Sequence, residues 1–280
     1  MSGVTHRIVL TGASGGLGHA FALALAPQAS AMVLCGRNHA RLEALRNKIE
    51  AMHPRASISC VQGDLLDAEV QARVFAAASG LSDPIDLLIN AAGTSDFRSF
   101  EQTDAATMQR LIGIDLLAPI AVTQRLLPLL RSAPRAQIVN IGSIFGYIGY
   151  PGFALYCATK FGLRGFSQAL RRELSDTRIS VRYFAPRAVR TDLNTPAVTG
   201  MNEELGNAQD APDAVAQALV RFLDARTWDR RLGLPERLYV WLNHIVPSVN
   251  DKAIRGQLAV IRKHLGQTAD LPPHPERKSR

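Results

Sequence analysis

Short apolar runs alternate with segments of helical periodicity along most of the chain. Six runs are rich in β-branched or aliphatic residues and mostly lack the alternation of a half-exposed strand, which predicts parallel strands buried on both faces. These runs are residues 8–11, 31–35, 57–61, 85–90, 137–141 and 179–184. Between them, the helical period predicts helices over residues 17–27, 39–52, 67–78, 104–131, 154–175 and 211–225.

This alternation of strands and helices predicts an α/β fold, a Rossmann-like doubly wound parallel sheet with right-handed crossovers. Such a sheet binds its ligand at the carboxyl ends of the strands. After residue 226 the alternation stops, and Pro235 and Pro247 delimit two further predicted helices, over 236–245 and 250–265. The expected organisation is a main domain, a helical extension packed on it and a disordered tail, over residues 1–225, 226–270 and 271–280.

The composition fits a globular protein with a sizeable core. Hydrophobic residues make up 47% of the 280 positions and charged residues 20%, which argues against disorder. The three cysteines are too scattered for a disulfide framework, and the seven histidines show no ligand spacing, so no metal is expected. The N-terminus does not resemble a signal peptide, and no apolar run reaches the roughly 20 residues of a membrane-spanning helix. We therefore expect a cytoplasmic protein.

The formal net charge of +8 is concentrated near the C-terminus. Residues 226–280 contain eleven Lys or Arg and five Asp or Glu, so this segment alone carries +6. No nucleic-acid-binding motif accompanies the charge, and no nucleic-acid partner is expected. The apolar stretch 238–249 precedes four basic residues, Lys252, Arg255, Arg262 and Lys263. This part of the chain could cover a ligand pocket, form a subunit interface or contact an anionic membrane, or its charge could simply belong to a solubilising helix face and a frayed end.

A glycine-rich turn follows the first predicted strand and opens the first predicted helix. Its residues are Thr11, Gly12, Ala13, Ser14, Gly15, Gly16, Leu17 and Gly18. Glycines allow a tight turn and close backbone approach, so that free N–H groups and the helix dipole can face a pyrophosphate. At the end of the second strand, Gly36 stands where a carboxylate would bind ribose hydroxyls, and Arg37 follows it. Because a guanidinium suits a 2′-phosphate, NADP(H) is favoured over NAD(H).

Three polar residues follow the fifth predicted strand at an informative spacing. Tyr156 and Lys160 are one helical turn apart on the same helix face, and Ser143 precedes Tyr156 by thirteen residues. A tyrosine with a pKa near 10 is a weak base at neutral pH, but a neighbouring ammonium stabilises the phenolate. Ser143 can polarise a carbonyl through a hydrogen bond. The set predicts proton transfer at a carbonyl or alcohol oxygen, with Tyr156 as the transferring group.

Together these residues resemble the short-chain dehydrogenase/reductase family over residues 5–200. The glycine turn alone also fits the TGxxGxxG turn of the family's longer branch, whereas the Ser143–Tyr156–Lys160 spacing resembles the shorter reductase/dehydrogenase branch. The resemblance implies an NAD(P)-dependent oxidoreductase that transfers a hydride between nicotinamide and a carbonyl or secondary alcohol. It also implies coenzyme contacts from Tyr156, Lys160 and the ends of further strands, at Asp64, Leu65, Asn90, Ala91, Gly93, Pro186 and Thr191.

Two positions depart from the family pattern. Asp115 stands where relatives carry an asparagine whose backbone supports a water chain leading to the lysine. We count Asp115 as a candidate catalytic residue, and an ionised carboxylate there would offset the cation that lowers the pKa of Tyr156. Arg187 replaces the glycine of a Pro-Gly pair. Either Arg187 or Arg190 meets an anionic group of substrate or coenzyme, or both face solvent.

The expected pocket wall is mostly apolar or aromatic, although some of its side chains could instead pack the core. It comprises Ile144, Phe145, Tyr147, Ile148, Tyr150, Phe153 and Leu193. It suits a hydrophobic carbonyl compound, such as a ketoacyl chain, a steroid-like ring or an aryl ketone. The basic C-terminal segment would also suit an acidic acyl-carrier protein that presents the substrate. Apolar residues on more than one face of segment 116–130 favour packing against another helix or subunit, and we expect a homodimer or homotetramer. The alternative function is a catalytically impaired, coenzyme-binding regulatory or scaffold protein of the same fold.

Overall fold

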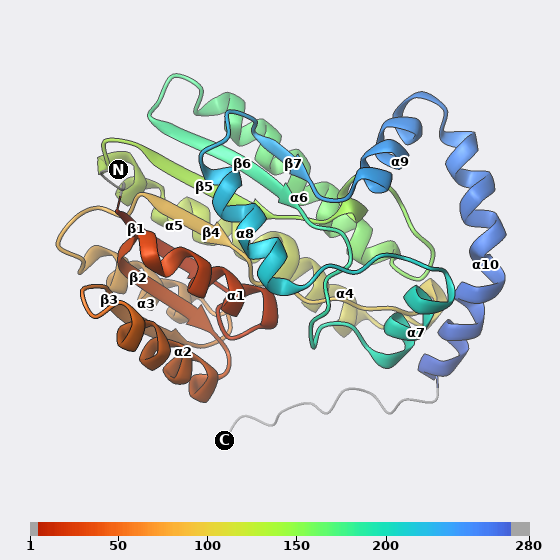
Figure 1. The fold of residues 1–280 in the computed structure, drawn as a ribbon, viewed down its shortest axis with the longest axis horizontal. Coiled ribbons are helices and arrows are strands. Elements are labelled where there is room, and N and C mark those ends of the chain that lie inside the picture. The colour runs from red at the N-terminus through yellow and green to blue at the C-terminus, as the bar shows by residue number, and fades with distance from the viewer. Residues whose placement is uncertain (1–4, 270–280) are drawn as a thin grey trace.

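A seven-stranded parallel sheet forms the centre of the computed structural model, which describes residues 5–269 (Figure 1). The strands follow the order β3-β2-β1-β4-β5-β6-β7, and each neighbouring pair is parallel. Their bounds are β1 His6–Thr11, β2 Ala29–Gly36, β3 Ser57–Gln62, β4 Leu87–Asn90, β5 Ala136–Ile141, β6 Ile179–Ala185 and β7 Asp229–Arg231. The chain winds outward in one direction from β1 and in the other from β4, so these neighbours form the switch point where doubly wound sheets bind ligands.

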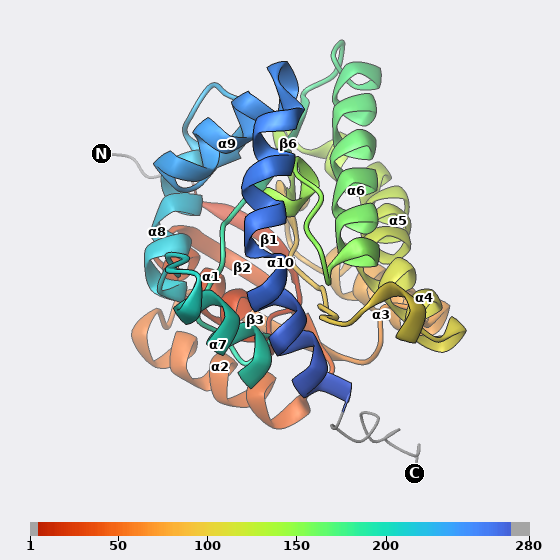
Figure 2. The same ribbon diagram turned by 90° about the vertical axis from the view of Figure 1, so that its right-hand side faces the viewer.

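Helices cover both faces of the sheet (Figures 1 and 2). One face carries α1 Gly16–Leu25, α2 His39–Met52 and α8 Pro212–Leu223, and the other carries α3 Ala68–Ser79, α5 Ala118–Ser132 and α6 Ala154–Glu173. Each layer buries an apolar stripe against the strands, with Phe21 and Leu219 on the first face and Val74 and Leu126 on the second. The predicted fold class, a Rossmann-like doubly wound α/β sheet, is confirmed.

One strand and one α-helix of the structure were not expected from the sequence. The strand β7 has the sequence Asp-Arg-Arg and pairs with β6 through Tyr183 and Asp229. It lies at the sheet edge, where it joins the sheet through backbone hydrogen bonds. Its side chains therefore do not have to be apolar, and the sequence shows no strand pattern there. The helix α7, Pro196–Glu204, starts where Thr195 accepts a hydrogen bond from the backbone of Val198. The region after residue 226 therefore adds a strand to the main sheet before its two helices.

The segment predicted as one helix over 104–131 is divided by a π-helical turn. It consists of α4 Ala105–Ile112, the turn η3 Gly113–Leu117 and α5. By length and hydropathy alone, Ala105–Ser132 could cross a membrane. In the structure its inner face packs in the core beside the sheet, where Val122 and Leu126 are buried. Its 18-residue apolar window is 44% buried, so a large part of its hydropathy serves the core of the protein.

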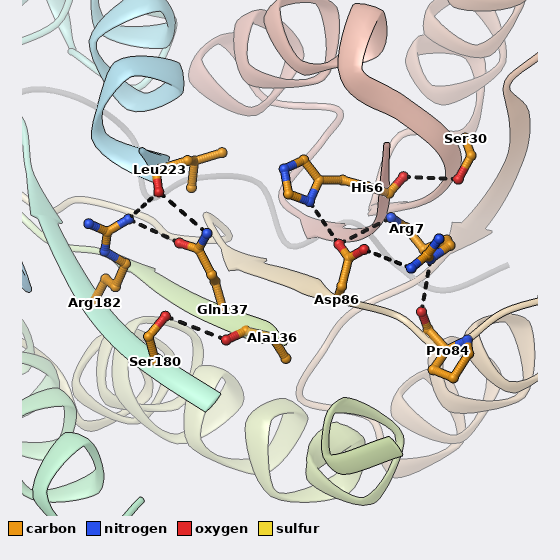
Figure 3. Close-up of polar contacts among 10 residues, drawn as sticks. All are labelled: His6, Arg7, Ser30, Pro84, Asp86, Ala136, Gln137, Ser180, Arg182 and Leu223. Carbon is orange, nitrogen blue, oxygen red and sulfur yellow. Dashed lines mark hydrogen bonds and ion pairs between the residues drawn. The ribbon is translucent and has the colours of Figure 1, made fainter. Parts of the chain in front are cut away.

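Buried charged groups fix the amino ends of the strands, opposite the expected ligand site (Figure 3). Arg182 on β6 is only 5% exposed and donates to the side chain of Gln137 and to the backbone oxygens of Leu223, Ala225 and Thr227. On the other side, Asp86 accepts from His6 and Arg7 at the start of β1 (Figure 3). The Arg182 contacts tie the link between α8 and β7 to the central sheet.

The C-terminal extension lies across the carboxyl-end side of the sheet. It contains α9 Leu234–Ile245 and α10 Pro247–Ala269, which runs back along α7 (Figures 1 and 2). As predicted, Pro247 separates the two helices. Residues 271–280, expected to be disordered, lie outside the described residues.

Candidate active site

Tyr156 and Lys160 lie in the first two turns of α6, and Ser143 follows β5. The Lys160 ammonium is 5.4 Å from the centre of the Tyr156 ring. Ser143 caps the short 3₁₀ turn η4, Ile144–Gly146, where its hydroxyl accepts from the backbone N–H of Phe145. The structure therefore brings the three residues together at the carboxyl end of β5, as their spacing predicts.

Asp115 points toward Lys160 from the π-helical turn. Its Oδ2 atom lies 3.7 Å from the Lys160 ammonium, and both side chains are buried. Its Oδ1 atom accepts from the backbone N–H of Thr94 at 2.7 Å, whereas Oδ2 has no hydrogen-bond partner. Lys160 also donates to the backbone oxygen of Ile141 at 3.5 Å. The side-chain carboxylate of Asp115 is thus the counter-ion of the buried Lys160 ammonium.

Gly93 leaves the space that this ion pair occupies. A Cβ atom at residue 93 would lie 3.2 Å from Asp115 Oδ1 and 3.6 Å from Lys160 Nζ. The chain after β4 therefore passes directly over the pair, and a larger side chain there would crowd it. Gly93 was predicted to contact the coenzyme. In this fold it also leaves space for the Asp115 carboxylate.

The pKa of Tyr156 lies above its ordinary value. Burial is the main cause, the negative charge of Asp115 raises it further, and a hydrogen bond from Ser143 partly opposes both. Lys160 was expected to lower this pKa, but its positive charge lies beside the Asp115 carboxylate. Burial also raises the pKa of Asp115, while Lys160 and the Thr94 N–H lower it. Asp115 therefore weakens the effect that the lysine would have on the tyrosine.

The glycine-rich turn packs against the ends of two other strands. Gly12 has a positive φ of 73°, and a Cβ atom there would lie 2.7 Å from the backbone of Ala91 and Ala92. The Thr11 hydroxyl accepts from the N–H groups of those two alanines, at 3.0 and 3.1 Å. Position 18 also has no room for a side chain, because a Cβ atom there would lie 2.2 Å from the backbone oxygen of Gly12. The backbone thus forms the close turn that a pyrophosphate requires.

The remaining residues of the turn form the start of α1. Gly15 caps the helix, Gly16 is its first residue, and Leu17 packs on the core. Ser14 lies against Gly36 at the end of β2, where a Cβ atom would approach the Ser14 hydroxyl to 2.4 Å. A carboxylate-bearing residue at position 36 would therefore collide with the turn as it stands.

The end of β2 presents two arginines. Arg37 is exposed directly after the strand, and Arg41 lies in the first turn of α2. Asn38 caps this helix by accepting from the Arg41 N–H. The Arg41 guanidinium forms an exposed ion pair with Asp192, 3.1 Å away, from the loop after β6. Arg41 was missed in the sequence analysis, although its spacing of four from Arg37 at the start of a predicted helix was a usable signal.

Other predicted coenzyme residues occupy the ends of β3 and β4. Asp64 is exposed and accepts from the backbone of Leu66, and Leu65 is buried beneath it. The Asn90 side chain instead donates to Asn140 and Thr123, at 2.8 and 3.0 Å, inside the protein. Because its amide donor is used there, Asn90 holds the end of β4 in place, where the backbone of Ala91 borders the glycine turn.

The loop after β6 brings Thr191 over the glycine turn. A Cβ atom at Gly16 would lie 3.1 Å from the Thr191 methyl group. Pro186 accepts from the backbone N–H of Ile144 at 3.2 Å and so connects this loop to the Ser143 turn. Pro186 and Thr191 therefore lie at the same carboxyl-end edge of the sheet as Ser143 and the glycine turn.

Arg187 is engaged by carboxylates of the protein itself. Its guanidinium donates to both oxygens of Asp210, at 2.7 and 3.0 Å, and to Glu236 on α9 at 3.4 Å. These carboxylates raise the pKa of Arg187. Arg190 is exposed and donates to the backbone oxygen of Gln209. Arg187 therefore does not simply face solvent, because its side chain is only 22% exposed and ties α9 to the loop after β6.

The expected pocket wall divides into two groups. Ile144, Tyr147 and Ile148 belong to the core, packed with Tyr183 and Val240, so their assignment to the pocket is wrong. Leu193 is exposed. The rings of Phe145, Tyr150 and Phe153 instead cluster with Tyr156.

Side chains from distant segments complete this aromatic cluster. They are Phe97, Ala197, Val198, Met201, Leu205, Ile261 and Leu265, and several come from α7 or α10; Cys157, next to Tyr156 on α6, belongs to the same cluster. Tyr150 also donates to Gln257 on α10 at 2.8 Å. The sequence carried no signal for these partners, because α7 was not predicted and the position of α10 depends on packing.

The family comparison agrees with this geometry. The family model described as "short chain dehydrogenase" matches residues 6–202. This chain is 30% identical over 253 residues to "Dehydrogenase/reductase SDR family member 7B" of Xenopus laevis, covering 86% of this chain and 78% of that protein. It is 30% identical over 229 residues to "NADP-dependent 3-hydroxy acid dehydrogenase" of Schizosaccharomyces pombe, covering 78% of this chain and 87% of that protein.

A solved structure extends the likeness to nearly the whole chain. The "Short-chain dehydrogenase from Sphingobium yanoikuyae in complex with NADPH" superposes with a TM-score of 0.72 at 25% identity. The match covers 98% of this chain and 99% of that one.

Proposed function

The chain belongs to the short-chain dehydrogenase/reductase family of NAD(P)-dependent oxidoreductases, and from this premise we propose that it interconverts a hydrophobic ketone and its secondary alcohol with NADP(H). One observation carries the choice of substrate class. Tyr156 lies among the rings of Phe145 and Phe153 and beside apolar side chains of α7 and α10. Phe145, Tyr150 and Tyr156 are only partly buried in this cluster, and such apolar surface beside the proton-transferring group favours substrates that bury rings or acyl chains there.

In this proposal Tyr156 exchanges a proton with the substrate oxygen. Ser143 donates a hydrogen bond to the same oxygen and orients it. Lys160 supplies positive charge next to the tyrosine, and Asp115 is a positioning residue that holds the lysine 3.7 Å away. The ring of Phe145 meets Tyr156 edge-on, at 6.3 Å between centres, and limits the directions from which a substrate can approach.

The residues of the glycine turn fit a dinucleotide. Gly12 and Gly18 leave no room for a side chain, so the backbone of the turn is the surface that a pyrophosphate would meet. Arg37 and Arg41 would hold the adenosine 2′-phosphate of NADP(H), Asp64 would lie near the adenine, and Thr191 near the nicotinamide. When bound, the coenzyme supplies or accepts the hydride.

A substrate panel tests this function. NADPH consumption should be fastest with ketones that carry a ring or a long acyl chain, and a short-chain 3-oxo acid should be a poor substrate. A 3-oxoacyl group on an acidic acyl-carrier protein, compared with the same group on a small thiol, tests whether the basic C-terminal segment recognises the carrier. Preference for small polar ketones would contradict the hydrophobic assignment.

The variant Tyr156→Phe separates catalysis from binding. Its turnover should fall by at least about a thousandfold, because the proton donor is lost, while NADPH fluorescence should show unchanged coenzyme binding. The control variant Tyr150→Phe keeps the ring and loses only a hydroxyl bonded to α10, so it should retain turnover. If the wild-type protein binds NADPH but reduces none of the panel, the alternative of a regulatory or scaffold protein is supported instead.

Self-association is part of the same proposal. The exposed apolar side chains of Ile112, Leu117 and Phe161 lie on α4, η3 and α6, which pack together at one side of the molecule. They suit a homodimer or homotetramer interface, and we place the protein in the cytoplasm. Light scattering after size exclusion should give a multiple of 30.4 kDa, and Phe161→Glu should reduce it.

A further inference from the structure

The outward face of α9 carries an apolar stripe that no described part of the chain covers. Leu234, Leu238, Trp241 and Ile245 recur at intervals of four, three and four residues, so they share one face of the helix. Each is more than half exposed, from 55% for Trp241 to 78% for Leu234. We call these four residues the α9 stripe. Val246 and Val249 continue it into the start of α10 and are 42% and 48% exposed.

The opposite face of α9 already makes the contacts that attach it to the protein. Val240 is fully buried in a core cluster with Tyr147 and Tyr183. Asn243 donates to the backbone oxygen of Tyr147, and Asn250 at the start of α10 donates to that of Tyr239. The α9 stripe therefore adds nothing to the packing of this chain. An exposed apolar patch that folding does not require indicates contact with another surface.

Positive charge surrounds the stripe. Arg231 and Arg237 line an open hollow together with Leu234, Leu238 and Trp241. Within the described residues neither arginine pairs with a carboxylate; Arg237 is exposed, and the partly buried Arg231 lies 5.3 Å from the centre of the Tyr147 ring. The nearby acids are engaged elsewhere, since Asp229 accepts from Tyr147 and Glu236 from Arg187.

The basic excess continues along the chain. From residue 237 to residue 263 the sequence has five Lys or Arg and a single acid, Asp251. Lys252 and Arg255, just past the turn into α10, are both exposed. The stripe thus has a cationic border that extends onto the next helix.

We propose that the α9 stripe and its arginines bind the surface of an anionic phospholipid bilayer. Leucine, isoleucine and tryptophan side chains can enter the interface between headgroups and acyl chains, while arginines contact lipid phosphates. A second copy of this chain fits less well, because a symmetric interface would place this cationic border against its own copy, and like charges repel. Figures 1 and 2 show α9 and its turn into α10 at the periphery, where a flat surface can reach them.

Vesicle sedimentation tests this surface with the full-length protein. Wild-type protein should sediment with vesicles of phosphatidylglycerol and phosphatidylcholine and much less with phosphatidylcholine alone. Raising the salt from about 0.1 M to about 0.5 M should release part of it, because added ions screen the arginines. The double variant Leu238→Glu/Trp241→Glu should lower the partition coefficient at least about tenfold, since it removes two apolar contacts and adds two negative charges.

A matched control keeps the result specific. Met52 at the end of α2 is 48% exposed and lies outside the stripe, so Met52→Glu should bind vesicles like the wild type. Thermal unfolding should show that both variants remain folded. Equal binding by the double variant and the wild type would overturn the proposal. So would a wild type that ignores anionic vesicles and instead forms an oligomer that the double variant dissociates.

Tryptophan fluorescence gives a second, independent readout. The protein has two tryptophans, and only Trp241 lies in the stripe, because Trp228 packs between the core and Arg171. Anionic vesicles should shift the emission to shorter wavelength, and lipids brominated near the headgroup should quench it. Both effects should vanish in Trp241→Phe, which keeps an apolar ring and should still sediment. A shift that persists in Trp241→Phe would place the contact elsewhere and contradict the proposal.

Discussion

The carboxylate of Asp115 lies 3.7 Å from the ammonium of Lys160, and both groups are buried beneath the backbone of Gly93. The family's asparagine would be neutral at this place. A charged partner changes the electrostatics of the site, because its field acts on Tyr156 as well as on the lysine. Asp115 raises the pKa of Tyr156, in addition to the effect of burial.

The variant Asp115→Asn should shift the pH–rate profile of alcohol oxidation to lower pH. Oxidation needs the tyrosine in its phenolate form, so its rate rises as pH passes the tyrosine pKa. Removing the negative charge lowers that pKa, and the rising limb moves to lower pH. The measurement is kcat/KM against pH at saturating coenzyme. The surface variant Asp176→Asn should leave the profile unchanged, and an unmoved limb in Asp115→Asn would show that the carboxylate is not charged there.

The variant Arg37→Ala should weaken NADPH binding more than NADH binding. Loss of a charge-assisted contact to the 2′-phosphate corresponds to a change in Kd of about 10- to 100-fold. Fluorescence titration with each coenzyme measures it, and Arg41→Ala should act in the same direction. Arg55→Ala, an exposed arginine at the other end of the sheet, serves as control. Equal losses for the two coenzymes would argue against a role in their discrimination.

The variant Arg187→Gly restores the family's residue and should destabilise the protein. It removes a bidentate ion pair with Asp210 and the link to Glu236, which corresponds to about 1–3 kcal/mol. Urea unfolding measures the loss, and the α9 region should become more sensitive to protease. Arg187→Lys should fall between, because lysine cannot form the fork. A variant of full stability with weaker NADPH binding would instead assign Arg187 to the coenzyme.

The variant Arg182→Met should lower the free energy of unfolding by about 1–3 kcal/mol, since one buried and two part-buried hydrogen bonds from a buried guanidinium to backbone oxygens are lost. Urea unfolding monitored by circular dichroism measures the change. Arg178→Met, one strand position outside β6 and exposed, should alter it by less than about 0.5 kcal/mol. Similar stability of the two variants would mean that water satisfies these carbonyls after substitution.

The central fold could be predicted from the sequence because each of its strands and helices has a local pattern of apolar residues. Buried strands such as β5 show as apolar runs, and α2 was predicted with the bounds that the structure has. The spacing of Tyr156 and Lys160 places both on one helix face without any tertiary information. For the same reason β7 was missed, since Asp229, Arg230 and Arg231 join the sheet through backbone pairing alone.

Contacts between segments far apart in the sequence could not be predicted from local sequence patterns. The partners of Arg187 lie 23 and 49 residues further along the chain, so no spacing rule connects them. The direction of Asp115 depends on a π-helical turn within a continuous apolar helix, where periodicity reveals no break. The aromatic cluster around Tyr156 closes only when α7 and α10 pack on it.

The π-helical turn at Gly113–Leu117 also fixes how many residues this part of the chain must have. Such a turn holds one residue more than a regular helix, and deleting that residue would rotate one flank by about 100° relative to the other. Either Asp115 would turn away from Lys160 or Leu126 would leave the core. Natural variants of this protein should therefore gain or lose residues in surface loops, while the stretch between Gly113 and Leu126 keeps a constant length.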